Sequence, residues 1–375
     1  MFLVFVILWT CLGSKPVYGA DSYIEGLKDY NFSELEEQLK QQQNDTFSFG
    51  EVVQKVMKGD ILEAIKLVLK GMIDQVLSEL VSNKKLLIQI ICVAVFSAIF
   101  TNFSGAFSSK NVGEAGFFVT YLILFSILAT SYGLGSALTA KAVKSLLEFM
   151  KVLIPTFCMA VTSASGFTGS AGIYGVLMLA VMSANYLILT ILLPFTNLYF
   201  MLQMVDNLGK ERHFSRFAVL IKKGVEWALR TLFIGIVGVQ VLQGLILPAI
   251  DSVKGTVVQK GVSLIPGAGQ AISAVLNTMI GAGVIIKNSI GVAGLLCILF
   301  FISLPVIKLI IFSVSYQVLS AVLQPISDKR VTDCIQSAGE ATALLLRMIW
   351  VVAGLFMVSL ALAAASTNTV YYSQI

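Results

Sequence analysis

Six long apolar segments constrain this chain more than any other feature of its sequence. Each approaches or exceeds the roughly 20 residues that a helix needs to cross the hydrocarbon core of a bilayer, and none carries Asp or Glu at its centre. Lipid offers no partners to backbone N–H and C=O groups, so such segments cross a membrane as helices. We therefore predict an all-α polytopic membrane protein. The predicted spans are residues 86–107, 117–139, 172–195, 229–249, 290–312 and 341–363.

The composition supports a membrane protein and argues against several other classes. Hydrophobic residues make up 57% of the chain and charged residues 13%, whereas soluble domains have about 45–50% and about 25%. The net charge of +5 is not gathered into one dense patch, which argues against a nucleic-acid partner. The five cysteines are far apart and form no CxxC pair, so we expect no metal site and no cofactor.

Residues 2–12 form an apolar run of the length found in secretory signal peptides. Val17 and Ala20 stand at the −3 and −1 positions of a cleavage site before Asp21. We expect a signal peptide at residues 1–20, with an uncleaved membrane anchor as the alternative. Either outcome places residues 21–85 outside the cytoplasm.

The segment 21–85 is acidic, and its pattern predicts helices. Three pairs have the spacing of a helix-capping box: Ser33 with Glu36, Ser48 with Glu51, and Asp60 with Glu63. After the third pair, apolar residues recur at helical spacing and form one wide stripe. This extracytoplasmic amphipathic helical segment must bury its stripe. It packs either on its own helices and the membrane surface or on a partner protein.

The connector at residues 206–230 is the most basic stretch between two predicted spans. Short loops rich in Lys and Arg stay on the cytoplasmic side, so we place this connector in the cytoplasm. Counting back through three spans puts residues 21–85 outside, as the leader requires. Counting forward puts the tail 364–375, which has no Lys or Arg, outside as well. We therefore expect a multi-pass protein of the cell membrane with an extracytoplasmic N-terminal segment.

Two proline-containing stretches, residues 140–171 and 251–289, do not fit a simple crossing. A Leu-Ile-Pro triplet ends at Pro155 in the first and at Pro266 in the second, and a tract of small residues follows each. We predict two Pro/Gly-broken re-entrant or amphipathic elements, related as a weak internal repeat. Paired interruptions point to a transport path, and small residues also allow close helix packing; both interpretations stay open. The candidate residues are Pro155, Ser163, Ser165, Gly166, Gly169, Pro266, Gly267, Gly269, Gly281 and Gly283, with Gly235, Gly238, Gly291 and Gly294 as further candidates for close packing.

The sequence shows no set of residues arranged for catalysis. His213 is the only histidine and lies in the basic connector, and no P-loop sequence GxxxxGK[ST] occurs. We therefore expect neither an enzyme nor a pump driven by its own nucleotide site. Basic residues of the connector and of the last span are predicted to lie at the membrane interface. For the connector, a docking site for a cytoplasmic partner is the alternative. These interfacial candidates are Arg216, Lys222, Lys223 and Arg347.

The most specific stretch runs from Leu264 to Gly269 and then from Gly283 to Gly294. Together with the leader, the acidic segment and the two Leu-Ile-Pro tracts, it makes the whole chain resemble the stage III sporulation protein AE family of endospore-forming Firmicutes. The resemblance implies a polytopic scaffold or path-lining component of a channel or secretion-like complex between mother cell and forespore, located in the mother-cell membrane. It implies a cytoplasmic ATPase and ring-forming proteins as partners, and no catalytic residues. A stand-alone permease for a small solute and a purely structural membrane anchor are the alternatives.

Overall fold

The computed structural model describes residues 49–58, 110–165, 167–209, 213–263, 269–325 and 327–372, with isolated positions between 60 and 99. Within these ranges, residues 49, 110–113, 163–171, 244–282 and 365–372 are described by their backbone alone. The signal peptide at 1–20, most of the segment 21–85 and most of the first predicted span at 86–107 lie outside the described residues, so these predictions stay predictions.

Every element in the described part of the chain is a helix, and five stretches are long and apolar enough to cross a membrane. These stretches are Glu114–Thr162, Gly172–Leu208, Ser215–Gln243, Gly283–Leu323 and Lys329–Ala364. The predicted class, an all-α polytopic membrane protein, is thereby confirmed. The elements are α4 (Phe49–Met57), α6 (Lys110–Ser165), α7 (Phe167–Asn185), a π-helical turn η2 (Tyr186–Leu192), α8 (Leu193–Leu208), α9 (Ser215–Ser263), α10 (Gly269–Leu323) and α11 (Lys329–Tyr372).

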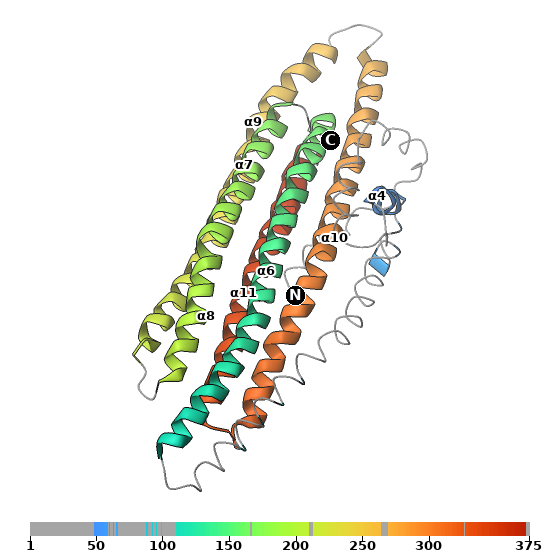
Figure 1. Ribbon diagram of the computed structural model, residues 1–375. Coiled ribbons are helices and arrows are strands. Elements are labelled where there is room, and N and C mark those ends of the chain that lie inside the picture. Colours follow the sequence, from blue (N-terminus) through green and yellow to red (C-terminus); the bar gives the residue numbers. More distant parts are fainter. Residues whose placement is uncertain are drawn as a thin grey trace.

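The long helices lie side by side and alternate in direction, with α7, η2 and α8 forming one continuous rod (Figure 1). We call the end where α8 turns into α9 and α10 turns into α11 the α8/α9 end, which is lowermost in Figure 1. The opposite end, where α9 turns into α10, is the α9/α10 end. In the most apolar windows of α10 and α11, 67% and 61% of the residues are buried, against 22% in α9. The helices α10 and α11 are therefore central, and α9 is peripheral.

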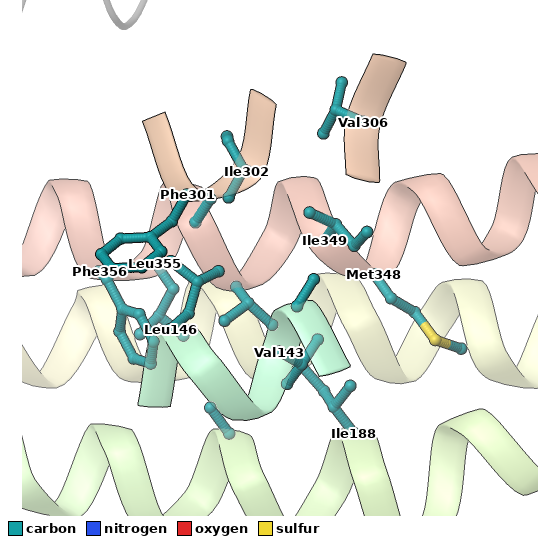
Figure 2. Packing of buried hydrophobic residues seen from close by; sticks show 14 of the residues in the cluster. Val143, Leu146, Ile188, Phe301, Ile302, Val306, Met348, Ile349, Leu355 and Phe356 are labelled. Carbon is teal, nitrogen blue, oxygen red and sulfur yellow. The ribbon is translucent and has the colours of Figure 1, made fainter. Parts of the chain in front are cut away.

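The core of the bundle consists of large apolar side chains that meet between α6, α10 and α11 (Figure 2). The residues that Figure 2 labels are Val143 and Leu146 of α6, Ile188 of η2, Phe301, Ile302 and Val306 of α10, and Met348, Ile349, Leu355 and Phe356 of α11. The outer faces are apolar too: Leu134, Leu179 and Leu242 are each more than half exposed. A bundle that is apolar inside and outside is suited to lipid as its surrounding solvent.

The helix α6 runs through Pro155 without ending, which corrects the expected position of the first interruption. The chain instead reverses between Ser165 and Phe167, inside the small-residue tract. Pro155 leaves the carbonyl of Lys151, four residues earlier, without its regular N–H donor. Membrane helices tolerate this because neighbouring helices and small local adjustments satisfy the freed group, and Leu153 and Phe157 on either side of the proline are fully buried. Glycine and serine in the tract disfavour continued helix more than one proline does here.

The second predicted interruption lies where two helices meet. Residues 251–263 continue α9 and residues 269–289 belong to α10, so the chain reverses between Ser263 and Gly269. Both helices are roughly 70–85 Å long at 1.5 Å per residue, more than twice the ~30 Å hydrocarbon core. They extend past the ends of α6 and α11 at the α9/α10 end (Figure 1). The stretch 251–289 is thus two helical arms rather than an irregular element.

The turn η2 interrupts the middle of the α7–α8 rod. Pro194 is the cause, since its ring clashes with the carbonyl four residues earlier and it has no N–H to donate. The backbone widens by one residue at this point, and the Leu193 N–H donates to the Ile188 carbonyl five residues back. Such single π-helical turns bend a helix without breaking it.

The short helix α4 packs its apolar face on α10, beside the half of α10 nearer the α9/α10 end (Figure 1). Val52 and Val53 are fully buried, while Glu51 and Lys55 form an ion pair at 3.3 Å on the outer side. This contact uses part of the segment 21–85 to cover the bundle itself. The apolar stripe predicted after Asp60 lies mostly outside the described residues.

Candidate functional site

The candidate site is a group of polar side chains that joins α8, α9 and α11 near the α8/α9 end, and Glu340 of α11 is its centre. The Lys222 ammonium donates to Glu340 Oε2 at 2.9 Å, and the Tyr199 hydroxyl donates to the same oxygen at 3.1 Å. Gln336 Nε2 donates to the other carboxylate oxygen at 3.3 Å. The side chains of Lys222 and Glu340 are 29% and 36% exposed. One carboxylate thus ties three helices together while remaining partly open to solvent.

A second contact closes the turn between α8 and α9. Asp206 is 3% exposed, and its Oδ1 accepts the backbone N–H of Phe214 at 2.7 Å. The neighbouring Asn207 donates from Nδ2 to the Ser337 hydroxyl of α11 at 3.1 Å. These bonds hold the start of α9 against α8 and α11. The helix α9 begins at Ser215, so four of the six basic residues in the predicted connector belong to this helix: Arg216, Lys222, Lys223 and Arg230.

Two further cations have partners on neighbouring elements at this end. Arg347 of α11 donates from Nη1 to Glu226 Oε1 of α9. Arg330 pairs with Asp328 at 3.2 Å, and its guanidinium carbon lies 3.5 Å from the centroid of the Phe117 ring of α6. The α8/α9 end is thus fastened by charge as well as by apolar packing.

Uncharged polar side chains link the helices deeper in the bundle. The Tyr132 and Ser136 hydroxyls of α6 both donate to Asn197 Oδ1 of α8, at 3.0 and 2.9 Å. Gln240 of α9 donates to the Ser359 hydroxyl of α11 at 2.7 Å. Gln240 lies inside a predicted span and Asn197 just beyond the end of another, but the sequence alone does not show the partner of either residue. Hydrogen bonds of this kind hold membrane helices in register.

The predicted path-lining or packing residues fall into three groups. Pro155 is exposed on the outer face of α6, and Gly283 is buried on α10. Ser163, Ser165, Gly169, Gly269 and Gly281 lie in helices that are described there by backbone alone. Gly166, Pro266 and Gly267 lie outside the described residues. The structure does not bring the two tracts into one described site, so their role stays a prediction.

Close packing is visible at other glycines of α10. A Cβ atom placed on Gly294 would lie 2.7 Å from Leu153 Cδ2 of α6 and 3.4 Å from Leu360 Cδ1 of α11. One on Gly291 would lie 3.5 Å from the Phe157 ring. A Cβ on Gly235 or Gly238 of α9 would meet nothing within 4 Å in the described part of the chain. Small residues therefore bring α10 against α6 and α11, whereas the two candidate glycines of α9 meet no neighbour among the described residues.

The residues predicted to lie at the membrane interface fall into two groups, exposed and ion-paired. Arg216 and Lys223 are exposed on α9, whereas Lys222 and Arg347 are engaged by Glu340 and Glu226. Examination of each span separately could not find these partners, because they lie 118 and 121 residues away on other helices. In the described part of the chain, His, Cys, Asp and Glu nowhere form a group of three able to hold a metal ion.

The Lys222–Glu340 pair should be worth more than an exposed ion pair in the same chain. In a double-mutant cycle of Lys222→Met and Glu340→Gln, we expect a coupling of about 1 kcal/mol, the upper part of the range for partly exposed pairs. The measurement is the melting temperature and denaturant midpoint of the purified full-length protein in detergent. The matched control is Lys144 with Glu148, which are 3.9 Å apart with side chains 71% and 42% exposed. Equal coupling in both cycles would contradict a role for the Glu340 cluster in joining the helices.

The fold and these contacts define an all-α polytopic membrane protein whose buried polar groups serve to join helices. The chain belongs to the stage III sporulation protein AE family, since the family model described as Stage III sporulation protein AE (spore_III_AE) matches residues 47–367. A relative from Bacillus subtilis (strain 168), also described as Stage III sporulation protein AE, is 22% identical over 336 residues, which cover 85% of this chain and 82% of the relative. No solved structure matches this chain.

Proposed function

We propose that this protein is the polytopic membrane component of a channel or secretion-like complex between mother cell and forespore, needed for sporulation after engulfment. It acts as a scaffold in the mother-cell membrane and has no energy source of its own. Membership of a stage III sporulation family supports a role in sporulation. The proposed partners are a cytoplasmic ATPase and ring-forming proteins.

The dense packing at the centre of the bundle supports the proposed role as a scaffold. The largest fully buried side chains include Phe149 and Phe157 of α6, Phe312 and Tyr316 of α10, and Phe356 of α11. A permease that works alone needs a polar route through its own fold. Here aromatic and aliphatic side chains occupy the space between the central helices (Figure 2). A path to which this protein contributes would therefore run between subunits.

The charges support an orientation for the scaffold. The α8/α9 end carries Arg216, Lys223, Lys329 and Arg330, and short basic connections stay in the cytoplasm. We place this end in the mother-cell cytoplasm, where an ATPase can reach it. The helix α4 and the rest of the segment 21–85 then lie on the other side of the membrane, where ring-forming partners assemble.

The α9 and α10 arms are the parts best placed to meet other subunits, since they extend past α6 and α11 (Figure 1). They include Gly269, Gly281 and Gly283, three of the residues predicted to line a path. We assign the contact with neighbouring subunits to these arms. Cysteine substitutions at Gly269 and Gly281 should react with a water-soluble thiol reagent in the isolated protein and be protected in the assembled complex, whereas a cysteine at the buried Gly283 should be protected in both.

The full-length protein with an affinity tag tests the proposed function directly. Purified from sporulating cells in a mild detergent, it is expected to bring down an ATPase and ring-forming proteins. Reconstituted alone in liposomes, it is expected to move no small solute above the level of empty vesicles. Uptake of a solute by the protein alone would contradict the proposal and favour a permease. Purification without any partner from cells that sporulate normally would contradict it as well.

A further inference from the structure

The outward face of α9 carries three side chains in one line at the α8/α9 end. Lys223, Trp227 and Arg230 are spaced by four and three residues, which places them on one side of a helix. All three are exposed, and Trp227 is 70% exposed, more than any other large apolar side chain in the described part of the chain. We call these three residues the α9 stripe. Arg216 continues it two turns closer to the start of the helix.

Among the described residues, the cations of the α9 stripe differ from the neighbouring cations in having no acidic partner. Lys222, the residue next to Lys223, points inward and pairs with Glu340 at 2.9 Å. Glu226, one residue before Trp227, is engaged by Arg347 of α11. Within the described residues, neither Lys223 nor Arg230 has an ion pair. The inward-facing Lys222 and Glu226 therefore pair with charged residues of α11, whereas the outward-facing Lys223 and Arg230 have no counter-charge among the described residues.

After Arg230, the outward face of α9 presents aliphatic side chains. Ile234, Val241 and Leu242 are 69%, 42% and 61% exposed, and α9 is the least buried of the five candidate spans. Lys223 and Arg230 are separated by about 10 Å along the helix, somewhat more than the headgroup zone on one side of a bilayer, about 5–8 Å, so their long side chains reach this zone from its two edges. Tryptophan is enriched at this depth because its ring is amphipathic. The stripe therefore stands where head groups meet the acyl chains.

We propose that the α9 stripe binds the head group of an anionic phospholipid, with Lys223 and Arg230 contacting the phosphate and Trp227 resting at the level of the glycerol. The acyl chains then lie along Ile234 and the aliphatic residues beyond it. A protein partner fits less well, because the apolar part of this face continues to membrane depth, where lipid is the neighbour. The proposal needs only the membrane-spanning bundle and holds whether or not the protein works in a complex.

The fluorescence of Trp227 provides the test. In a variant of the full-length protein with Trp9→Phe and Trp350→Phe, Trp227 is the only tryptophan. This variant is reconstituted in phosphatidylcholine vesicles that contain a minor fraction of brominated lipid, either phosphatidylglycerol or phosphatidylcholine. The brominated phosphatidylglycerol is expected to quench Trp227 well beyond its mole fraction. Removing one cation by Lys223→Gln or Arg230→Gln should lower the apparent affinity about fivefold, from about 1 kcal/mol for each basic residue at an anionic surface.

The matched control for the double change Lys223→Gln and Arg230→Gln removes two exposed lysines of α6, by Lys141→Gln and Lys151→Gln, with the same loss of net charge. This control should leave the quenching unchanged, and melting temperatures in detergent should show that all variants fold. Equal quenching by the two brominated lipids would overturn the proposal. So would preferential quenching by phosphatidylglycerol that survives the double change Lys223→Gln and Arg230→Gln, because the anionic lipid would then bind elsewhere near Trp227.

Discussion

Replacing Gly294 by leucine is expected to destabilise the bundle by more than about 2 kcal/mol, the level at which overpacking of a well-filled core becomes severe. The reason is the approach of α10 to two helices at once. The first added carbon would already lie 2.7 Å from one side chain of α6 and 3.4 Å from one of α11. Leu153 and Leu360 are themselves fully buried, so neither can move aside without displacing a further neighbour.

Gly238→Leu is the matched control, because it adds the same atoms to a glycine of α9 that has nothing within 4 Å in the described part of the chain. Leucine is the better helix former by somewhat less than about 1 kcal/mol, so this variant should be as stable as the parent or slightly more stable. The measurement is the unfolding temperature of both purified variants in the same detergent, with spore yield as the functional readout. Equal unfolding temperatures would mean that α10 does not depend on Gly294 for its close contact.

The two glycines show what sequence could and could not provide. Gly235 with Gly238 and Gly291 with Gly294 have the same spacing, and both pairs lie inside apolar segments. Spacing shows that a helix can be approached closely, but it does not show whether a neighbour lies there. That depends on α6 and α11, whose contacting residues are more than 60 positions away along the chain. The candidate packing glycines could therefore be named from the sequence but not ranked.

The spans were predictable because hydropathy is a local property. Four of the five candidate spans found in the structure each contain one predicted segment, and Ser215–Gln243 overlaps the predicted segment 229–249. The α8/α9 end carries Arg216, Lys222 and Lys223, three of the basic residues from which the orientation was predicted. The lengths were not predictable, because α9 and α10 continue as helices far beyond their apolar parts. Pro155 was misleading for a related reason. A proline weakens a helix locally, but the packing of Leu153 and Phe157 on α10 holds the two sides in line.

The ion pairs of the candidate site could not be predicted from the local sequence, because their partners lie on different helices. Arg347 was predicted to reach the membrane interface because it lies on the cytoplasmic side of its span and its long side chain can extend to that interface. The structure instead provides Glu226 from α9, in a register that only the folded bundle sets. Glu340 was not singled out at all, since a carboxylate near the end of a span is ordinarily solvated. Its importance comes from three donors that arrive from α8, α9 and α11.

Phe356→Ala is expected to have the largest effect of any single truncation considered for this protein, about 3–5 kcal/mol, the usual cost of emptying a buried phenylalanine site. Phe356 is fully buried and lies beside Phe301 and Leu146 in the middle of the bundle (Figure 2). The control is Phe195→Ala on α8, where the ring is 47% exposed on the outer face and its loss should cost far less. Unfolding temperatures in detergent measure the difference.

The same variant separates a scaffold from a permease. If the centre of the bundle is a packed core, Phe356→Ala lowers the unfolding temperature, and liposomes that contain it remain as tight to small solutes as those with the parent protein. If the aromatic side chains instead close a route through the single chain, removing one opens the route: the vesicles leak while stability changes little. The close packing of α6, α10 and α11 around this residue leads us to expect the first result. Leakage without destabilisation would contradict the scaffold proposal and would indicate that a transport path runs through the interior of the single subunit.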